Sequence, residues 1–286
     1  MDNFVSFTKT WHNKPYPSID PTRPELSAAG KFVAVTGGGT GIGRSIAIAF
    51  AQAGASTIAI LGRRLDRLET AAAEIAAASG GRTNVIFEAV DISQRSTLDA
   101  AVISLVKKAG GNKIDILISN AGVSPDVGAV VGFDEAEFRR GIELNVIGAF
   151  NTLQSFGPFL TSNAYIFNTS TGMVHLRPIA QGWAYTAVKA AVFKMFEYLQ
   201  DDKPEWHVVQ IQPGVIRTEL NERFDVVGQD DPALAARFYV WLASPEAEFL
   251  KGKFVWVNWD VDELKARADE IKNSLLFKVI LNGVPM

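Results

Sequence analysis

The stretch KFVAVTGGGTGIG, residues 31–43, decides the fold of this chain. It begins with a short Val-rich run typical of a buried strand and continues into closely spaced glycines that precede an apolar helical pattern. Glycines at such a turn let the backbone bend sharply and let a pyrophosphate approach the amides at the N-terminus of the next helix. The stretch therefore predicts a dinucleotide-binding turn. Its spacing, G-x-x-x-G-x-G, differs from the strict G-x-G-x-x-G, and a plain tight connection between strand and helix is the alternative.

Short runs rich in Val and Ile recur along the chain, and longer helical patterns separate them. One such helical pattern, 64–79, ends at Gly80-Gly81 as a helix C-cap would. Strands that are apolar on both faces and alternate with helices are typical of a parallel sheet covered on both sides. We therefore predict an α/β fold, a single doubly wound Rossmann-type domain over residues 31–286 with about seven parallel strands and helices on both faces. The expected strands are 31–36, 56–61, 84–90, 114–119, 164–169, 207–212 and 253–257.

Residues 1–30 are expected to form an extended N-terminal arm, because they carry four prolines and no periodic pattern. This segment lacks a basic start followed by an apolar core, so no secretory signal is expected. The uncharged stretch 45–62 is long enough to cross a bilayer, but Gly54 divides it into an apolar helix and a short β-branched run. A helix followed by a buried strand explains it, and we expect a cytoplasmic protein without membrane contact.

Composition excludes several classes of function. The chain of 286 residues has a net charge of -3, and its basic residues form no tract longer than a pair, so no nucleic-acid partner is expected. It has no cysteine, which excludes disulfides, zinc–thiolate sites and thiol nucleophiles. The histidines His12, His175 and His207 are far apart in sequence, and we expect no metal site.

The stretch GWAYTAVKAAV, residues 181–191, places Tyr185 and Lys189 four positions apart in a helical pattern. Their side chains therefore lie on the same face of the helix. A cation beside a phenol favours the phenolate, so Lys189 is predicted to lower the pKa of Tyr185 and to make it a proton donor or acceptor near neutral pH. The alternative is a helix whose Tyr and Lys tips reach water.

Several motifs in this order resemble those of the short-chain dehydrogenase/reductase family, and the resemblance covers nearly all of residues 31–260. The ending FVWVNWDVDEL departs from the family's Asp-Gly-Gly close and resembles a fungal-type subgroup. SNAG carries Ser119 where the family has Asn. The matching motifs are TGGGTGIG (36–43), Asp91-Ile92, SNAG (119–122), the set Asn145, Ser170, Tyr185 and Lys189, and PGVIRT (213–218).

The resemblance implies hydride transfer between a nicotinamide and a carbonyl or secondary alcohol. Tyr185 would act as general acid or base, Lys189 would assist it and bind the nicotinamide ribose, Ser170 would donate to the developing oxyanion, and Asn145 would hold a water linking Lys189 to solvent. The residues expected to bind the cofactor are Gly37, Thr40, Gly41, Ile42, Gly43, Arg63, Arg64, Asp91, Ile92, Asn120, Ala121, Gly122, Tyr185, Lys189, Pro213, Gly214, Ile216 and Thr218.

The end of the second expected strand, AILGRR (59–64), bears on the choice of cofactor. An acidic residue there would bind the adenosine 2′-hydroxyl and repel a 2′-phosphate, but Gly62 stands in that place, followed by Arg63 and Arg64. A guanidinium can hold a phosphate with two hydrogen bonds, so we expect NADP(H) rather than NAD(H). A solvated helix start is the alternative reading of the arginine pair. Thr40 stands where many NADP-preferring relatives have Lys or Arg, so that second signal is missing.

The hydroxyls of Thr169, Ser170 and Thr171 compete for the role of oxyanion donor. If AYIFNT (164–169) is a strand, successive side chains alternate, and Ser170 faces opposite to both threonines. Ser170 is therefore the predicted donor, and Thr171 would take its place if the strand ended one residue later.

The substrate cannot be read from the sequence. The segment after Thr218, ELNERFDVVGQDDP (219–232), is expected to form a short lid, and Trp183, Phe224 and Met173 are candidates for the substrate pocket or the core. The helices expected at 134–160 and 181–200 have wide apolar stripes, and the family resemblance implies that such helices are buried in a homodimer or homotetramer. A dehydratase or epimerase on the same fold, and an NADP(H)-binding regulatory protein, are the alternative functions.

Overall fold

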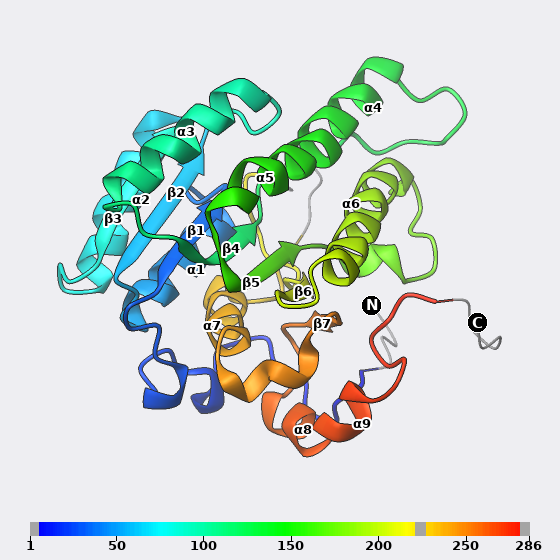
Figure 1. Ribbon diagram of the computed structural model, residues 1–286. Helices are drawn as coiled ribbons and strands as arrows, with labels where there is room; N and C mark the ends of the chain where they lie inside the picture. Colours follow the sequence, from blue (N-terminus) through cyan, green and yellow to red (C-terminus); the bar gives the residue numbers. More distant parts are fainter. Residues whose placement is uncertain (1–5, 221–226, 281–286) are drawn as a thin grey trace.

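A seven-stranded parallel sheet forms the centre of the molecule, in the order β3-β2-β1-β4-β5-β6-β7 (Figure 1). The computed structural model describes residues 6–220 and 227–280. The predicted Rossmann-type sheet in a single domain is confirmed. The strands are β1 (Phe32–Thr36), β2 (Thr57–Gly62), β3 (Asn84–Ala89), β4 (Ile114–Ser119), β5 (Leu160–Thr169), β6 (His207–Gln212) and β7 (Phe254–Trp256).

Helices cover both faces of the sheet (Figure 1). Side chains of α1, α2 and α7 pack on one face, and those of α3, α5 and α6 pack on the other. The helix bounds are α1 (Gly41–Gln52), α2 (Leu65–Ala78), α3 (Arg95–Lys108), α4 (Glu135–Gly141), α5 (Gly148–Phe156), α6 (Trp183–Asp202), α7 (Pro232–Leu242), α8 (Val261–Ala266) and α9 (Ala268–Lys272).

The alternation of side chains along β1 explains why this strand is apolar throughout. Val33 and Val35 belong to the core under α1 and α7, whereas Phe32 and Ala34 belong to the core under α3, α5 and α6. Burial of apolar surface on both faces stabilises the sheet by about 25 cal/mol per Å². A central strand of this fold therefore reads as a continuous apolar run.

The helix predicted at 134–160 is wrong in its continuity and in its end. Between α4 and α5 the backbone forms a π-helical turn, η3 (Ile142–Ile147), and β5 already begins at Leu160. An apolar repeat near 3.6 residues does not distinguish an α-helix from one that holds a π-helical turn. Such turns are rare and are frequently found at functional sites.

The order of the strands creates a crevice at the C-terminal end of β1. The chain passes from β1 to β2 and β3 on one side and returns to β4 on the other. At such a switch point the connections after the two central strands diverge, and ligands of doubly wound sheets bind there.

The first described residues, 6–30, lie along the C-terminal part of the chain rather than forming a layer of their own (Figure 1). They contain two single turns, η1 (Pro17–Ile19) and η2 (Pro24–Leu26). Ile19 and Leu26 are buried in the core beside α7. The segment is thus anchored by its own apolar side chains.

Candidate active site

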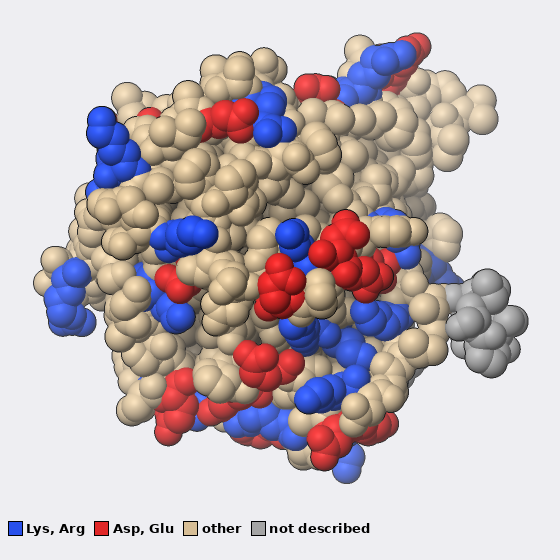
Figure 2. Space-filling model, in the orientation of Figure 1, with Lys and Arg blue, Asp and Glu red and all other residues tan. Residues whose placement is uncertain are grey.

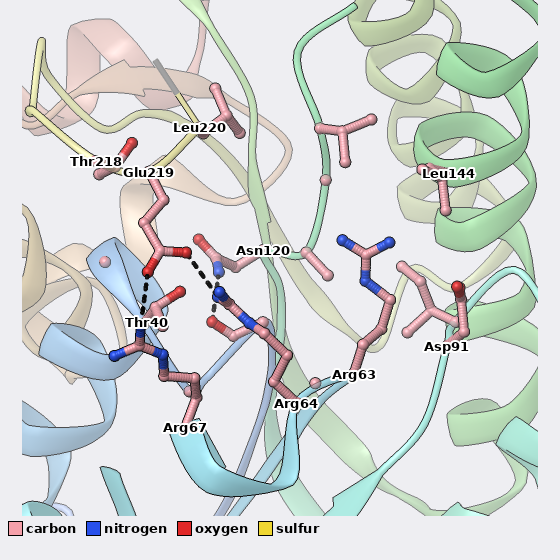
Figure 3. A pocket seen from close by; sticks show the side chains of 18 of the residues that line it. Thr40, Arg63, Arg64, Arg67, Asp91, Asn120, Leu144, Thr218, Glu219 and Leu220 are labelled. Carbon is pink, nitrogen blue, oxygen red and sulfur yellow. Dashed lines mark hydrogen bonds and ion pairs between the residues drawn. The ribbon is translucent and has the colours of Figure 1, made fainter. Parts of the chain in front are cut away.

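A pocket of about 620 Å³ opens at the predicted crevice (Figure 3). Its size suits a bound small molecule or cofactor. Within the described part of the chain, His, Asp and Glu side chains form no group of three or more that could hold a metal ion. The helices of residues 6–220 and 227–280 include none with the length and apolar character that a membrane span requires. The lining residues foreseen as cofactor-binding are Gly37, Thr40, Gly41, Ile42, Arg63, Arg64, Asp91, Ile92, Asn120, Ala121, Gly122 and Thr218.

The glycine loop has the shape that its sequence predicts. Gly37 and Gly41 have φ angles of 68° and 53°, in the left-handed region that favours glycine. A Cβ on Gly43 would lie 2.3 Å from the carbonyl oxygen of Gly37, so the first turn of α1 can approach the loop only with glycine there. Asn120 holds the loop from the β4 side, because its Nδ2 donates to the carbonyl of Thr36 at 3.0 Å.

Arginines from the start of α2 line one side of the pocket. Arg64 pairs with Glu219 at 2.6 Å, and Arg67 approaches the other oxygen of the same carboxylate at 3.9 Å. Figure 3 shows Arg63 extending in another direction, into the space between Asn120 and Leu144. Arg63 is therefore the arginine of the predicted pair whose guanidinium is directed into the pocket.

Residues that the sequence reasoning did not foresee complete the lining. Arg67 had a signal, because it lies one helical turn beyond Arg63 and Arg64. Glu219 was noted only as the first residue of the expected lid. The other lining residues that were not foreseen are Gly39, Leu68, Val90, Val123, Ser124, Glu137, Arg140, Leu144 and Leu220.

The catalytic candidates lie outside this lining, as do Gly43, Pro213, Gly214 and Ile216. Lys189 is buried on α6, and its Nζ donates to the carbonyl of Thr169 at 2.9 Å. The Lys189 Nζ lies 5.8 Å from the centre of the Tyr185 ring. The helix thus brings the two side chains together on one face, as their spacing predicts.

The predicted direction of the Tyr185 pKa is wrong. Burial raises the pKa of Tyr185 to about 12, and burial lowers the pKa of Lys189 to about 8. Desolvation disfavours the charged form of each group, and the Lys189 ammonium is directed at a carbonyl rather than at the phenol oxygen. Tyr185 is therefore protonated at neutral pH.

Asn145 lies in the π-helical turn, and its side-chain amide is engaged with backbone. Its Oδ1 accepts from the N–H of Val123 at 3.1 Å, and its Nδ2 donates to the carbonyls of Val123 and Gly141. A Cβ on Gly122 would lie 2.7 Å from that Oδ1 and 3.6 Å from the Nζ of Lys189. The loop after β4 therefore passes between Asn145 and Lys189, and only glycine fits at position 122.

The three hydroxyls at the end of β5 have different partners. Thr169 Oγ1 shares a hydrogen bond of 2.8 Å with the buried hydroxyl of Tyr239, and Thr171 Oγ1 accepts from the N–H of Met173 at 3.3 Å. Ser170 Oγ is buried and has no hydrogen-bond partner within the described residues. β5 ends at Thr169, where the sequence places its end.

Of the aromatic and Met candidates for a substrate pocket, Trp183 packs against Phe133 and Phe138, with ring centres 5.1 and 4.9 Å apart. Met173 lies in the short turn η5 (Gly172–Val174), where its Cε lies 2.5 Å from the position of a Cβ on Gly182. Phe224 lies outside the described residues. These contacts place Trp183 in a local aromatic cluster with α4.

Comparison with known proteins identifies the family. A model of the short chain dehydrogenase family matches residues 31–226. The chain belongs to the short-chain dehydrogenase family. Its predicted likeness to fungal members is confirmed: the short chain dehydrogenase pigC of Monascus ruber is 30% identical over 287 residues, covering 95% of this chain and 92% of pigC.

Solved short-chain dehydrogenases share the fold. 7α-Hydroxysteroid dehydrogenase, complexed with NADH and 7-oxo glycochenodeoxycholic acid, is 26% identical with a TM-score of 0.72, covering 85% of this chain and 97% of that chain. A short chain dehydrogenase from Burkholderia cenocepacia J2315, in complex with NADP, is 22% identical with a TM-score of 0.71, covering 82% and 99%. The fold binds nicotinamide cofactors, NADH in one neighbour and NADP in the other.

The residues of this chain fit a nicotinamide dinucleotide. Gly37 and Gly41 line the pocket at the N-terminus of α1, where backbone N–H groups can hold a pyrophosphate, and glycine at position 43 lets the first turn of α1 approach this loop. The pocket extends from these glycines to Asp91 on one side and to Thr218 on the other. No acidic residue stands at the end of β2, where Gly62 lines the pocket.

Proposed function

We propose that this short-chain dehydrogenase is an NADP(H)-dependent oxidoreductase that acts on a carbonyl compound or a secondary alcohol. The bound nicotinamide would supply or accept the hydride. Tyr185 would give a proton to the carbonyl oxygen as that oxygen gains negative charge, and would remove the proton in the oxidative direction. Because burial raises its pKa to about 12, the phenol of Tyr185 carries a proton at neutral pH, and a general acid transfers its proton best when its pKa lies near the operating pH.

The unpaired hydroxyl of Ser170 is the observation that carries this proposal. A buried hydroxyl without a partner costs about 1–3 kcal/mol, so a fold rarely keeps one without a use. Thr169 and Thr171 already use their hydroxyls within the protein. Thr171 Oγ1 only accepts there, so Ser170 Oγ is the one of the three hydroxyls with no partner at all within the described residues, and we propose it as the donor to an oxyanion.

Lys189 and Asn145 would support the reaction without themselves transferring the proton. We propose that Lys189 stabilises charge near the phenol and binds the nicotinamide ribose, and that its position is set by the carbonyl of Thr169. Asn145 would hold the loop after β4 in place through its amide. Any water that links Lys189 to solvent would then contact the backbone of Asn145 rather than its amide.

The choice of NADP(H) rests on Arg63. Its guanidinium is directed into the pocket, and Gly62 before it offers no carboxylate to repel a 2′-phosphate (Figure 3). Arg64 and Arg67 also follow β2, but both approach the carboxylate of Glu219. A 2′-phosphate would therefore find Arg63 available for a bidentate contact.

We also propose that the protein self-associates through the end of η3, α5 and α6. Ile147 and Phe150 are 37% and 44% exposed, and Tyr198 is 65% exposed. The surface over α5 is largely free of charge, whereas charged side chains gather toward α8 and α9 (Figure 2). Light scattering after size exclusion would test this, and a monomer at micromolar concentration would contradict it.

A spectrophotometric screen tests the proposed activity. The absorbance of the reduced nicotinamide is followed while ketones, quinones and secondary alcohols are offered with NADP(H) or NAD(H). Catalytic turnover with NADP(H) is expected. Stoichiometric binding of the cofactor without turnover of any compound would instead favour a regulatory protein, and turnover with NAD(H) alone would refute the assigned cofactor.

A further inference from the structure

The two ends of the segment that contains the expected lid are tied together at one place. The N–H of Val215 donates to Oδ2 of Asp230 at 2.6 Å, and the N–H groups of Gln229 and Asp230 donate to the carbonyl of Val215 at 2.8 and 3.2 Å. We call Gly214, Val215, Gln229 and Asp230 the neck. The chain that enters this segment at Val215 and the chain that leaves it at Gln229 and Asp230 are therefore joined by backbone hydrogen bonds and by the Asp230 carboxylate.

Asp230 also connects the neck to the N-terminal segment and to the residues after β7. Its Oδ1 accepts from Nδ2 of Asn13 at 2.6 Å and from Nδ2 of Asn258 at 2.9 Å. Asn13 contributes a second link, because its carbonyl accepts from the N–H of Asp231 at 2.9 Å. One carboxylate thus accepts N–H donors from the N-terminal segment, from the neck and from the residues after β7.

The carboxylate of Asp230 also sets the shape of the turn before Val215. Gly214 has φ of 91°, and a Cβ there would lie 2.7 Å from Oδ2 of Asp230. The carboxylate therefore packs directly on Gly214. Pro213 and Gly214 belong to the segment that the family resemblance places beside the nicotinamide.

Residues 254–264, FVWVNWDVDEL, depart from the usual C-terminal motif of the family and form the surface on which the N-terminal segment packs. Asn258 exchanges backbone and side-chain hydrogen bonds with His12, and Oδ2 of Asp260 accepts from Nε2 of His12 at 2.8 Å. The ring of Trp259 packs against Phe7, with centres 5.9 Å apart. Beyond Asn13, the hydroxyl of Tyr16 donates to the carbonyl of Trp259 at 3.3 Å and accepts from the N–H of Val261 at 2.9 Å. The N-terminal segment is thus held on both sides of Asn13, so Asn13 meets Asp230 in a fixed position.

We propose that Asp230 is a positioning residue for the nicotinamide end of the cofactor, and that the N-terminal segment acts through Asn13 to hold it. The carboxylate fixes the Gly214–Val215 turn, and Thr218, three residues beyond Val215, lines the pocket. This inference rests on the proposed function. It gives residues 6–30 a role in cofactor geometry beyond covering the core.

Asp230→Asn tests the proposal with two ligands. The substitution keeps the size of the side chain but turns one oxygen into an amino group, which must face N–H donors. Dissociation constants are measured for NADPH and for adenosine 2′,5′-bisphosphate, which has the adenosine half of the cofactor and no nicotinamide. We expect NADPH to bind more weakly and kcat to fall on the order of tenfold to a hundredfold. Binding of the bisphosphate should stay within about twofold, because its 2′-phosphate is proposed to bind Arg63 at the end of β2 rather than the neck.

A pair of variants in the N-terminal segment provides a matched control. Asn13→Ala and Ser18→Ala each remove one exposed side-chain hydrogen bond from this segment to the body of the protein, to Asp230 and Asp262 respectively. Asn13→Ala should weaken NADPH but not the bisphosphate, and Ser18→Ala should change neither. This pair decides the matter if Asp230→Asn does not fold.

The possible results separate this proposal from the proposed function. Equal weakening of both ligands in Asp230→Asn, or equal effects of Asn13→Ala and Ser18→Ala, would overturn the positioning role while leaving the oxidoreductase intact. Failure of the unaltered protein to bind NADPH would overturn the proposed function and this inference together.

Discussion

Removal of the Ser170 hydroxyl should separate activity from stability. In Ser170→Ala we expect kcat to fall by about 10²–10³, which is the usual cost of losing one donor to an oxyanion and corresponds to about 2.7–4 kcal/mol of transition-state stabilisation. The same change removes a buried hydroxyl that has no hydrogen-bond partner within the described residues. The free energy of unfolding should therefore stay constant or rise, by at most about 1–3 kcal/mol.

Thr169→Val is the matched comparison, because it removes a neighbouring hydroxyl with almost no change of shape. It breaks the 2.8 Å hydrogen bond to Tyr239 and leaves that buried phenol without a partner. We expect the free energy of unfolding to fall by about 1–3 kcal/mol. Turnover should change much less than in Ser170→Ala, because the carbonyl of Thr169 still accepts from Lys189.

The assay combines turnover on an identified substrate with urea unfolding of each variant. The expected pattern is an inactive but stable Ser170→Ala and an active but less stable Thr169→Val. Thr171→Ala should lose little activity, since its hydroxyl caps only the short turn η5. If Thr171→Ala is the variant with the crippled kcat, or if Ser170→Ala turns over normally, the assignment of the oxyanion donor is refuted.

Three further changes test other parts of the site. Arg63→Ala should weaken NADPH by about 1.5–3 kcal/mol with little effect on NADH; equal losses would mean that Arg63 does not contact the phosphate. Arg64→Ala, the control, should cost less because Arg64 is shared with Glu219. Lys189→Met should remove a pH dependence of stability. In the unaltered protein the unfolded chain keeps the Lys189 proton to about pH 10.5, whereas the folded chain loses it near pH 8. The free energy of unfolding of the unaltered protein should therefore rise relative to that of the variant between these pH values, by at most about 3 kcal/mol. A flat difference in urea unfolding between pH 8 and pH 10.5 would contradict the lowered pKa.

The sequence is sufficient for those features that depend on local pattern. The strand ending at Thr36, the positive φ of Gly37 and the common face of Tyr185 and Lys189 follow from glycine chemistry and helix geometry. The end of β5 at Thr169 follows from the alternation of its side chains and the polar residues after it.

Features that depend on distant parts of the chain could not be predicted in this way. Asn145 lies in a π-helical turn and bonds Val123 on the loop after β4, and sequence periodicity reports neither feature. The direction of the Tyr185 pKa shift depends on burial by the whole fold, so the spacing to Lys189 alone predicted the wrong direction. Asp230 gave no signal, because its donors lie at residues 13, 215 and 258.

The most direct test of the central claim compares the unaltered protein with Tyr185→Phe. Oxidation of NADPH is followed with a ketone that the screen identifies, and the dissociation constant of NADPH is measured for both proteins. We expect turnover to fall by about a hundredfold or more, since the variant has no proton to donate, while NADPH affinity stays nearly unchanged. Near-normal turnover in Tyr185→Phe would contradict the role of Tyr185 as general acid.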